Sequence, residues 1–233
     1  GMFYLPITKS VTIMGVDADG NEIIDASQTQ ATIYSDAAAT TGNWCDQNFI
    51  TVFADNVTIS GLTIMPHDYN GGTNKTIEVY TEAKNFTLKN CKLTPNTYLG
   101  TASADAGTLY FNGDKGTVLV EGNLFEKGCV VFDGVTTATS IEIKGNTFDT
   151  PAEDSYLIGN VTWSTPPTLD MADVTVEGNT FLNLPEDYDQ VVLHRMGGTF
   201  ILKDNTIPEG TTMTELVSFD SKRFYPNDYN GFV

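Results

Sequence analysis

One short pattern of apolar and polar positions recurs from near the N-terminus to beyond residue 200. Each copy reads apolar, variable, apolar, polar, Gly-like, Asn-like, variable, apolar. Six complete copies span 57–64, 86–93, 118–125, 141–148, 174–181 and 200–207, and 11–15 is a partial first copy. Alternation with a period of two is typical of a strand, because successive side chains point to opposite faces. Each copy therefore predicts a strand.

The fifth position of the pattern predicts a sharp bend after each strand. Its residues are of the three types that best tolerate a left-handed backbone, namely Gly15, Gly61, Asn90, Gly122, Gly145, Gly178 and Asp204. A further set of strands precedes the complete copies and follows the last one, at 50–53, 77–80, 109–112, 130–133, 157–160, 191–194 and 216–219. A third short stretch is expected around Phe125, Phe148 and Phe181. Strands joined by bends in this way predict coils that stack on one another.

Two polar columns indicate that the coils stack in register. The fourth, solvent-facing position reads Ser60, Lys89, Glu121, Lys144, Glu177 and Lys203. In coils about 4.8 Å apart these alternating charges lie on adjacent strands, where opposite charges stabilise and like charges destabilise. The sixth position includes Asn123, Asn146, Asn179 and Asn205. Stacked Asn side chains can hydrogen-bond one another and the backbone of the bends.

We therefore expect an all-β protein, a right-handed parallel β-helix solenoid of about seven to eight coils. The closest spacing between copies, 23 residues from Val118 to Ile141, fits a three-sided right-handed coil. A left-handed hexapeptide helix would instead repeat in multiples of six. Residues 1–233 are expected to form a single β-helix domain whose first coil is incomplete at the N-terminus.

The pattern resembles the pectin-lyase-like superfamily of right-handed β-helices, in particular the secreted, carbohydrate-related proteins of bacteria. The segment G-N-x-F after an alternating strand, together with the Asn and aromatic columns, carries this resemblance over roughly residues 9–207. The resemblance implies a ligand site along the sheet made by the first strand of each coil. The pectate lyase run R-x-P-x-x-R and the polygalacturonase segments N-T-D, D-D, G-H-G and R-I-K are absent from the sequence. No catalytic residue is therefore transferred to this chain.

Composition restricts the partners. Lys and Arg total 12 against 30 for Asp and Glu, which gives a formal net charge of −18. Nucleic acid and anionic membranes bind through Lys and Arg, so we expect neither as a partner. No cofactor and no metal site is expected, except that Ca²⁺ could bridge this chain to an acidic polysaccharide. Asp17, Asp19 and Asn21 resemble the start of a calcium loop, but Gln28 stands where the closing Glu belongs, so we expect a plain turn.

The expected location is extracellular, either secreted or at the cell surface. No apolar run approaches the roughly 20 residues of a membrane span. The sequence carries no signal peptide, and Gly1 is typical of a residue left after tag cleavage, which would accompany removal of an export signal. Cys45, Cys91 and Cys129 are expected to be buried free thiols. Because members of the superfamily usually carry a cap before the first coil, a partner domain or truncation is expected at the N-terminal end.

The outward positions of the first strands form two candidate columns. One reads Thr51, Glu78, Tyr110, Val131, Ile158, Val192 and Val217, and the other reads Phe53, Tyr80, Asn112, Asp133, Asn160, His194 and Phe219. Aromatic faces with amide and carboxylate groups are typical of sugar contacts. We therefore expect a carbohydrate-binding surface composed of Tyr80, Tyr110, Asn112, Asp133, Asn160 and His194. The alternative is that long connections cover this sheet, which the outward apolar residues favour.

Three functions remain open at this point. The leading hypothesis is binding of a polysaccharide or glycan on the first sheet. The second is a polysaccharide lyase or glycoside hydrolase, with His194 and Arg195 as a neighbouring base and cation and with Asp133 as a candidate acid. A hydrolase would need two carboxylates roughly 5–9.5 Å apart, for which Glu78 and Asp133 are marginal. The third is a structural stalk or adhesin module of a larger surface protein.

Overall fold

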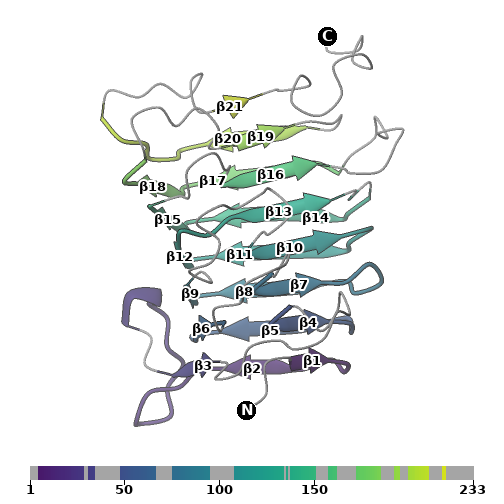
Figure 1. Ribbon diagram of the computed structural model, residues 1–233, viewed down its shortest axis with the longest axis vertical. Coiled ribbons are helices and arrows are strands. Elements are labelled where there is room, and N and C mark those ends of the chain that lie inside the picture. Colours follow the sequence, from purple (N-terminus) through teal and green to yellow (C-terminus); the bar gives the residue numbers. More distant parts are fainter. Residues whose placement is uncertain are drawn as a thin grey trace.

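The protein is a stack of coils in which every coil lies on the one before it (Figure 1). The computed structural model describes residues 5–28, 31–34, 48–66, 75–94, 108–133, 135, 137–150, 157–161, 172–184, 192–194, 199–209 and 217–218. Within these ranges the strands form three sheets, and all pairings between strands are parallel. The predicted class, a parallel β-helix solenoid, is confirmed. Right-handed winding remains the expectation, since nearly all crossovers between parallel strands have that hand.

The three sheets run the length of the stack. In spatial order, the first sheet contains β1 (Leu5–Ile7), β4 (Ile50–Val52), β7 (Ile77–Val79), β10 (Leu109–Asn112), β13 (Val130–Asp133), β16 (Ile158–Val161), β19 (Val192–His194) and β21 (Val217–Ser218). The second contains β2 (Thr12–Met14), β5 (Val57–Ser60), β8 (Phe86–Lys89), β11 (Thr117–Glu121), β14 (Ser140–Lys144), β17 (Val174–Glu177) and β20 (Phe200–Lys203). The third contains β3 (Thr32–Tyr34), β6 (Thr63–Met65), β9 (Lys92–Leu93), β12 (Leu124–Glu126), β15 (Thr147–Asp149) and β18 (Thr180–Leu182).

Each coil takes one strand from each sheet in turn. The described residues contain six such coils, a seventh with β19 and β20, and the first strand of an eighth. In the seventh coil Thr206 continues the third sheet through a parallel bridge to Thr180. The predicted number of seven to eight coils is therefore confirmed. No helix in the described ranges is long and apolar enough to cross a membrane.

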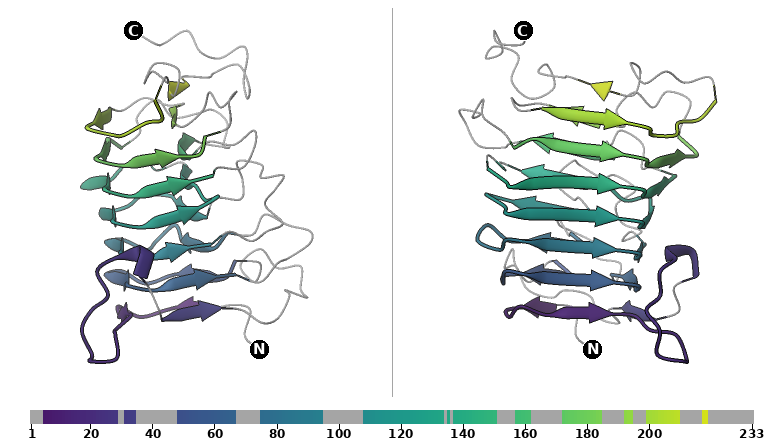
Figure 2. Two further views of the ribbon diagram at one scale, coloured as in Figure 1. Left: turned by 90° about the vertical axis from the view of Figure 1, so that its left-hand side faces the viewer. Right: turned by 180° about the vertical axis from the view of Figure 1, so that it is seen from behind.

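The first coil is more complete than the sequence pattern indicated. It has a strand in all three sheets, because β1 pairs with β4 and β3 pairs with β6. Within the described residues the first coil therefore contributes a strand to each of the three sheets. The sequence pattern did not predict β1 or β3. Pro6 lies within β1, and a proline is tolerated there because β1 is an edge strand of the described sheet. The insertion 15–31 separates β2 from β3 and so interrupts the repeat. Part of this insertion, with a short 3-10 helix at Ala26–Gln28, projects from the side of the first coil (Figure 2).

Stacked aromatic side chains occupy the interior of the middle coils. The rings of Phe125 and Phe148 lie 4.8 Å apart and nearly parallel, and Phe148 and Phe181 continue the stack at 5.4 Å. Phe111 and Phe132 form a second stack at 4.9 Å. All five rings are essentially inaccessible to solvent. The predicted third strand of each coil is thereby confirmed, since it brings the Phe125 column into the core.

The predicted bends after the second strands are confirmed at six of the seven positions. The residues with positive φ there are Gly61, Asn90, Gly122, Gly145, Gly178 and Asp204. Gly15 is the exception, because its φ is not in the left-handed region. A Cβ at Gly15 would lie 1.8 Å from the Gly61 carbonyl oxygen, so glycine is required there by the close contact between coils.

The asparagine ladder forms with the predicted register. Each Asn donates from Nδ2 to the Oδ1 of the next Asn, at 2.9 Å from Asn123 to Asn146, 2.9 Å from Asn146 to Asn179 and 3.0 Å from Asn179 to Asn205. Each Nδ2 also donates to a backbone carbonyl of the preceding coil, as Asn146 does to Val120 at 2.9 Å. The ladder therefore satisfies backbone groups that the buried bends would otherwise leave without partners.

The charged column also has the predicted register. Its members face one another on adjacent strands in the order Ser60, Lys89, Glu121, Lys144, Glu177 and Lys203. Lys203 and Glu177 form a direct ion pair at 2.7 Å. Lys144 instead pairs with Glu142 of its own strand at 2.5 Å. The alternation of charge is thus a property of the register, and only some of the lysines bond across strands.

Candidate functional site

The first of the two predicted outward columns is buried. Thr51, Glu78, Tyr110 and Val131 face one another on β4, β7, β10 and β13, as predicted. None of the four is more than 5% exposed. These four positions of the sheet are therefore closed to solvent, and the described residues Asn48 and Lys75 contact Glu78 and Tyr110 on this face.

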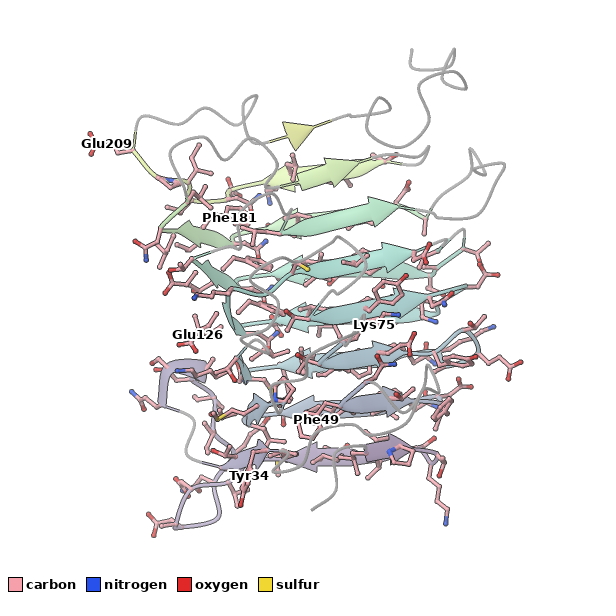
Figure 3. The ribbon with its side chains drawn as sticks, in the orientation of Figure 1. Tyr34, Phe49, Lys75, Glu126, Phe181 and Glu209 are labelled. Atoms are coloured by element: carbon pink, nitrogen blue, oxygen red, sulfur yellow. The ribbon has the colours of Figure 1, made fainter. Side chains whose placement is uncertain are left out.

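A chain of polar contacts, here called the Glu78 cluster, crosses this buried face. One Glu78 oxygen accepts a hydrogen bond from Asn48 Nδ2 at 2.5 Å, and the other lies 3.0 Å from Lys75 Nζ. Lys75, labelled in Figure 3, extends along the first sheet. Its ammonium lies over the Tyr110 ring, 3.5 Å from the ring centre. Tyr110 in turn donates from its hydroxyl to Asp133 at 2.5 Å. The cluster therefore links coils two to five through polar side chains that are largely withheld from water.

This arrangement changes the expectation for Tyr110. Its ring is only 4% exposed, and Lys75 lies over one of its faces. A sugar could stack on that face only if Lys75 moved away. The predicted contact role therefore receives no support from the geometry, and the side chain is a packing and hydrogen-bonding group in this structure.

The second outward column is open at its lower end. Phe53 and Tyr80 directly follow β4 and β7, and Asn112 and Asp133 are the paired last residues of β10 and β13. Tyr80 is 37% exposed, and the other three are half-buried. The rings of Phe53 and Tyr80 pack at a tilt with centres 5.2 Å apart. Four successive coils thus present two aromatic rings, an amide and a carboxylate at one edge of the first sheet.

Lys115 fixes the backbone behind this column. Its ammonium donates to the carbonyl oxygens of Tyr80 at 2.9 Å and Asn112 at 2.6 Å, with longer contacts to Thr81 at 3.4 Å and Asp114 at 3.3 Å. Removal from water lowers the pKa of Lys115 to about 8. One buried lysine therefore ties together the ends of β7 and β10, which carry two of the predicted contact residues.

The column does not continue through Asn160 and His194 as predicted. The pairing of β13 with β16 places Asn160 opposite Phe132, and the pairing of β16 with β19 places His194 opposite Asn160. Both positions therefore lie in the register of the inward residues, and Ile158, predicted to face out, is fully buried. The cause is the pair of adjacent apolar residues at 157 and 158, since a slip of one residue exchanges the two faces of a strand.

The predicted catalytic residues are not brought together by the described contacts. Asp133 stands at the end of β13, whereas the backbone of His194 is two strands further along the sheet, and Arg195 lies outside the described residues. Both oxygens of Glu78 are bonded within its cluster, and Asp133 accepts from Tyr110. A free carboxylate pair of the kind that a hydrolase uses is therefore not formed by Glu78 and Asp133.

The sequence reading missed Asn48, Lys75 and Lys115. The sequence did contain a pattern that includes Asn48 and Lys75, because Asn48 stands two residues before β4 and Lys75 stands two residues before β7. Extending the predicted register by two residues would have stacked them on adjacent coils, next to Glu78. Lys115 gave no such signal, because it lies in a turn between strands, outside any periodic pattern.

Metal ligation has no support in the described ranges. They contain no group of three or more His, Cys, Asp or Glu side chains that could hold an ion. At the sequence resembling a calcium loop, Asp17 accepts hydrogen bonds from the backbone of Asp19 and Asn21, both at 2.9 Å. These bonds and the Asn21 side chain hold the pKa of Asp17 below its usual value. Asp17 therefore closes a hydrogen-bonded turn at this position.

Cys91 is a free thiol in the core, as predicted, and burial raises its pKa to about 12. Cys129 is also free but half-buried, and Cys45 lies outside the described residues.

No protein-family model, no curated protein and no solved structure matches this chain. The parallel β-helix fold is therefore defined by the three parallel sheets and the asparagine ladder of this chain alone.

Proposed function

We propose that this protein is an extracellular, carbohydrate-binding β-helix of the pectin-lyase-like type. Its ligand is a neutral glycan that lies along the ends of β4, β7, β10 and β13. The observation that supports this proposal is the open column of Phe53, Tyr80, Asn112 and Asp133, with the exposed Tyr80 ring packed 5.2 Å from Phe53. Three coil steps of about 4.8 Å extend this column over ~14 Å, the scale of a short oligosaccharide.

The chemistry of the column suits a sugar chain. Aromatic rings offer apolar faces to the C–H groups of a pyranose, and the Asn112 amide and Asp133 carboxylate can hydrogen-bond its hydroxyls. Lys115 holds the backbone of Tyr80 and Asn112, so little ordering would be required on binding. The net charge of −18 disfavours uronates and sulfated glycans. A neutral polysaccharide is therefore the favoured class.

Binding to a panel of xylans, other neutral polysaccharides, uronates and host glycans tests this proposal. We expect affinity for a neutral member of the panel, and we expect Tyr80→Ala to abolish it. Tyr34→Ala is the matched control, because Tyr34 is 65% exposed on β3 of the third sheet. A panel without any binder, or equal losses in the two variants, would reject the proposal. Scanning the same mixtures for unsaturated products and new reducing ends would detect catalysis.

A structural role in a larger surface protein is the second candidate. It is favoured by the burial of Thr51, Glu78, Tyr110 and Val131, which leaves much of the first sheet closed to a ligand. A thermally robust protein that binds no member of the panel would support this role over glycan binding.

A further inference from the structure

Lys75, Asn48 and Glu78 combine a nucleophile, an electrophile and a proton acceptor at one buried point. Lys75 and Asn48 each contact a different oxygen of the same Glu78 carboxylate, at 3.0 Å and 2.5 Å. The backbone N–H of Lys75 also donates to Asn48 Oδ1 at 3.2 Å. The orientation of the amide follows from its partners, because a carboxylate must accept from Nδ2 and an N–H must donate to Oδ1.

The Lys75–Glu78 ion pair and Asn48 are largely protected from water. The side chains of Lys75 and Glu78 are 12% and 7% exposed, and Asn48 is 3% exposed. By comparison, both side chains are at least 31% exposed in the pairs Lys89–Glu22, Lys92–Glu126, Lys144–Glu142 and Lys203–Glu177. Burying an ion pair is costly in free energy, so its retention here calls for a purpose beyond stability. Exclusion of water also favours attack by an amine over hydrolysis of an amide.

We propose that Lys75 and Asn48 become joined by an intramolecular isopeptide bond, with Glu78 as the proton-transfer group. Glu78 accepts a proton from the Lys75 ammonium, and the resulting amine attacks Cγ of Asn48. The oxygen that becomes negative is Asn48 Oδ1, which already accepts the Lys75 backbone N–H. This hydrogen bond polarises the amide carbonyl before attack.

The reaction balances without any other reagent. The Nζ–Cγ bond forms, and the Cγ–Nδ2 bond breaks. Of the three protons on the Lys75 ammonium, one remains on the new amide and two pass through Glu78 to Nδ2. Nδ2 leaves as ammonium, Glu78 returns to a carboxylate, and no group is oxidised or reduced. General acid–base transfer of this kind typically contributes ~10²–10⁴-fold to a rate.

The bond would link two successive coils. Asn48 and Lys75 stand at equivalent places before β4 and β7. The two coils are already joined there, because the backbone N–H of Phe49, the residue after Asn48, donates to the Lys75 carbonyl at 3.0 Å. The Tyr110 ring borders Lys75 on the side of β10 and keeps it directed at this face of the sheet.

Intact-mass measurement of the purified full chain tests the proposal. We expect the mass to be lower than the sequence mass by one ammonia, and we expect digestion to yield one branched peptide that contains Asn48 and Lys75. Glu78→Gln should slow the formation of this peptide by ~10²–10⁴-fold. Lys75→Arg retains the charge over Tyr110 and should abolish it. Lys92→Arg, which alters a lysine paired with Glu126 on the third sheet, is the control in which the bond should form normally.

Three results would overturn the proposal. One is a wild-type chain that keeps its sequence mass after prolonged incubation in its folded state. Another is loss of ammonia without a branched peptide, which would indicate a succinimide at an Asn-Gly step such as Asn112–Gly113 instead. The third is a branched peptide formed equally fast in folded Glu78→Gln, which would remove Glu78 from the reaction. The wild-type measurement decides the presence of the bond even if a variant fails to fold.

Discussion

Replacement of Asn146 by alanine would remove the middle of the asparagine ladder. Asn146 Nδ2 donates to the Val120 carbonyl and to Asn179 Oδ1, both at 2.9 Å. Its Oδ1 accepts from the backbone N–H and the Nδ2 of Asn123, again at 2.9 Å. Four hydrogen bonds in a buried bend are therefore lost together.

The cost follows from what remains after the substitution. Asn179 Oδ1 keeps the bond from the backbone of residue 146, and Asn123 Nδ2 keeps its bond to the Leu88 carbonyl. The backbone N–H of Asn123 loses its acceptor, and a buried donor left unpaired costs about 1–3 kcal/mol. The lost donor to Val120 adds about 1 kcal/mol. We expect a total of about 3 kcal/mol, a large part of the stability of about 5–15 kcal/mol typical of a domain.

Urea unfolding followed by circular dichroism would measure this loss, with hydrogen exchange to locate it. Asn205→Ala is the matched control, because Asn205 ends the ladder and is half-buried, so water can replace its bonds. We expect the control to lose much less stability than Asn146→Ala. A loss below about 1 kcal/mol at Asn146, or equal losses in both variants, would refute the view that buried bends depend on the ladder.

Three further outcomes are expected. Lys144→Glu places a negative charge between Glu121 and Glu177, so the urea midpoint should fall at low salt and recover at high salt; a salt-independent fall would contradict this electrostatic account. The pKa of Lys115 is about 8 in the folded protein, against an ordinary value of 10.5. The unfolded chain therefore binds the Lys115 proton more tightly than the folded protein does. Because of this difference, the contribution of Lys115 to the free energy of unfolding rises as pH increases from about 8 to about 10.5. Unfolding titrations across this range should show the rise in wild type and its loss in Lys115→Met. Cys91 should react with a thiol reagent only at the rate of unfolding, since its thiol is buried and its pKa is raised to about 12, and rapid labelling of the native protein would be the contrary result.

The periodic parts of the fold were predictable because their physical causes repeat. The bends at Gly122, Gly145 and Gly178 and the order of the charged column follow from a pattern that each coil imposes on the next. The prediction was wrong where local sequence offered two solutions. At Leu157 and Ile158 either residue could face inward, and the structure pairs Ile158 with Val130. Pattern alone does not decide between such neighbours, because both are apolar.

The candidate site was predictable only in part for a related reason. Tyr80, Asn112 and Asp133 end periodic strands, so the register located them on one edge. The covering of Tyr110 was not predictable, because it depends on Lys75 reaching across from the turn before β7. Contacts made by turn residues depend on side-chain direction, which the alternation of strands does not specify.

The stacking direction has a mechanical meaning. β1 and β21 stand at opposite ends of the first sheet, and the hydrogen bonds between coils run along the axis that joins them (Figure 1). A force applied along this axis would load one coil interface after another, so the chain should lengthen in steps of one coil. From the second coil onward, the copies of the second strand are spaced from 23 residues, between Val118 and Ile141, to 33 residues, between Ile141 and Val174, so the steps should be unequal in length. A covalent link between Asn48 and Lys75 would make the second and third coils resist traction as a single unit.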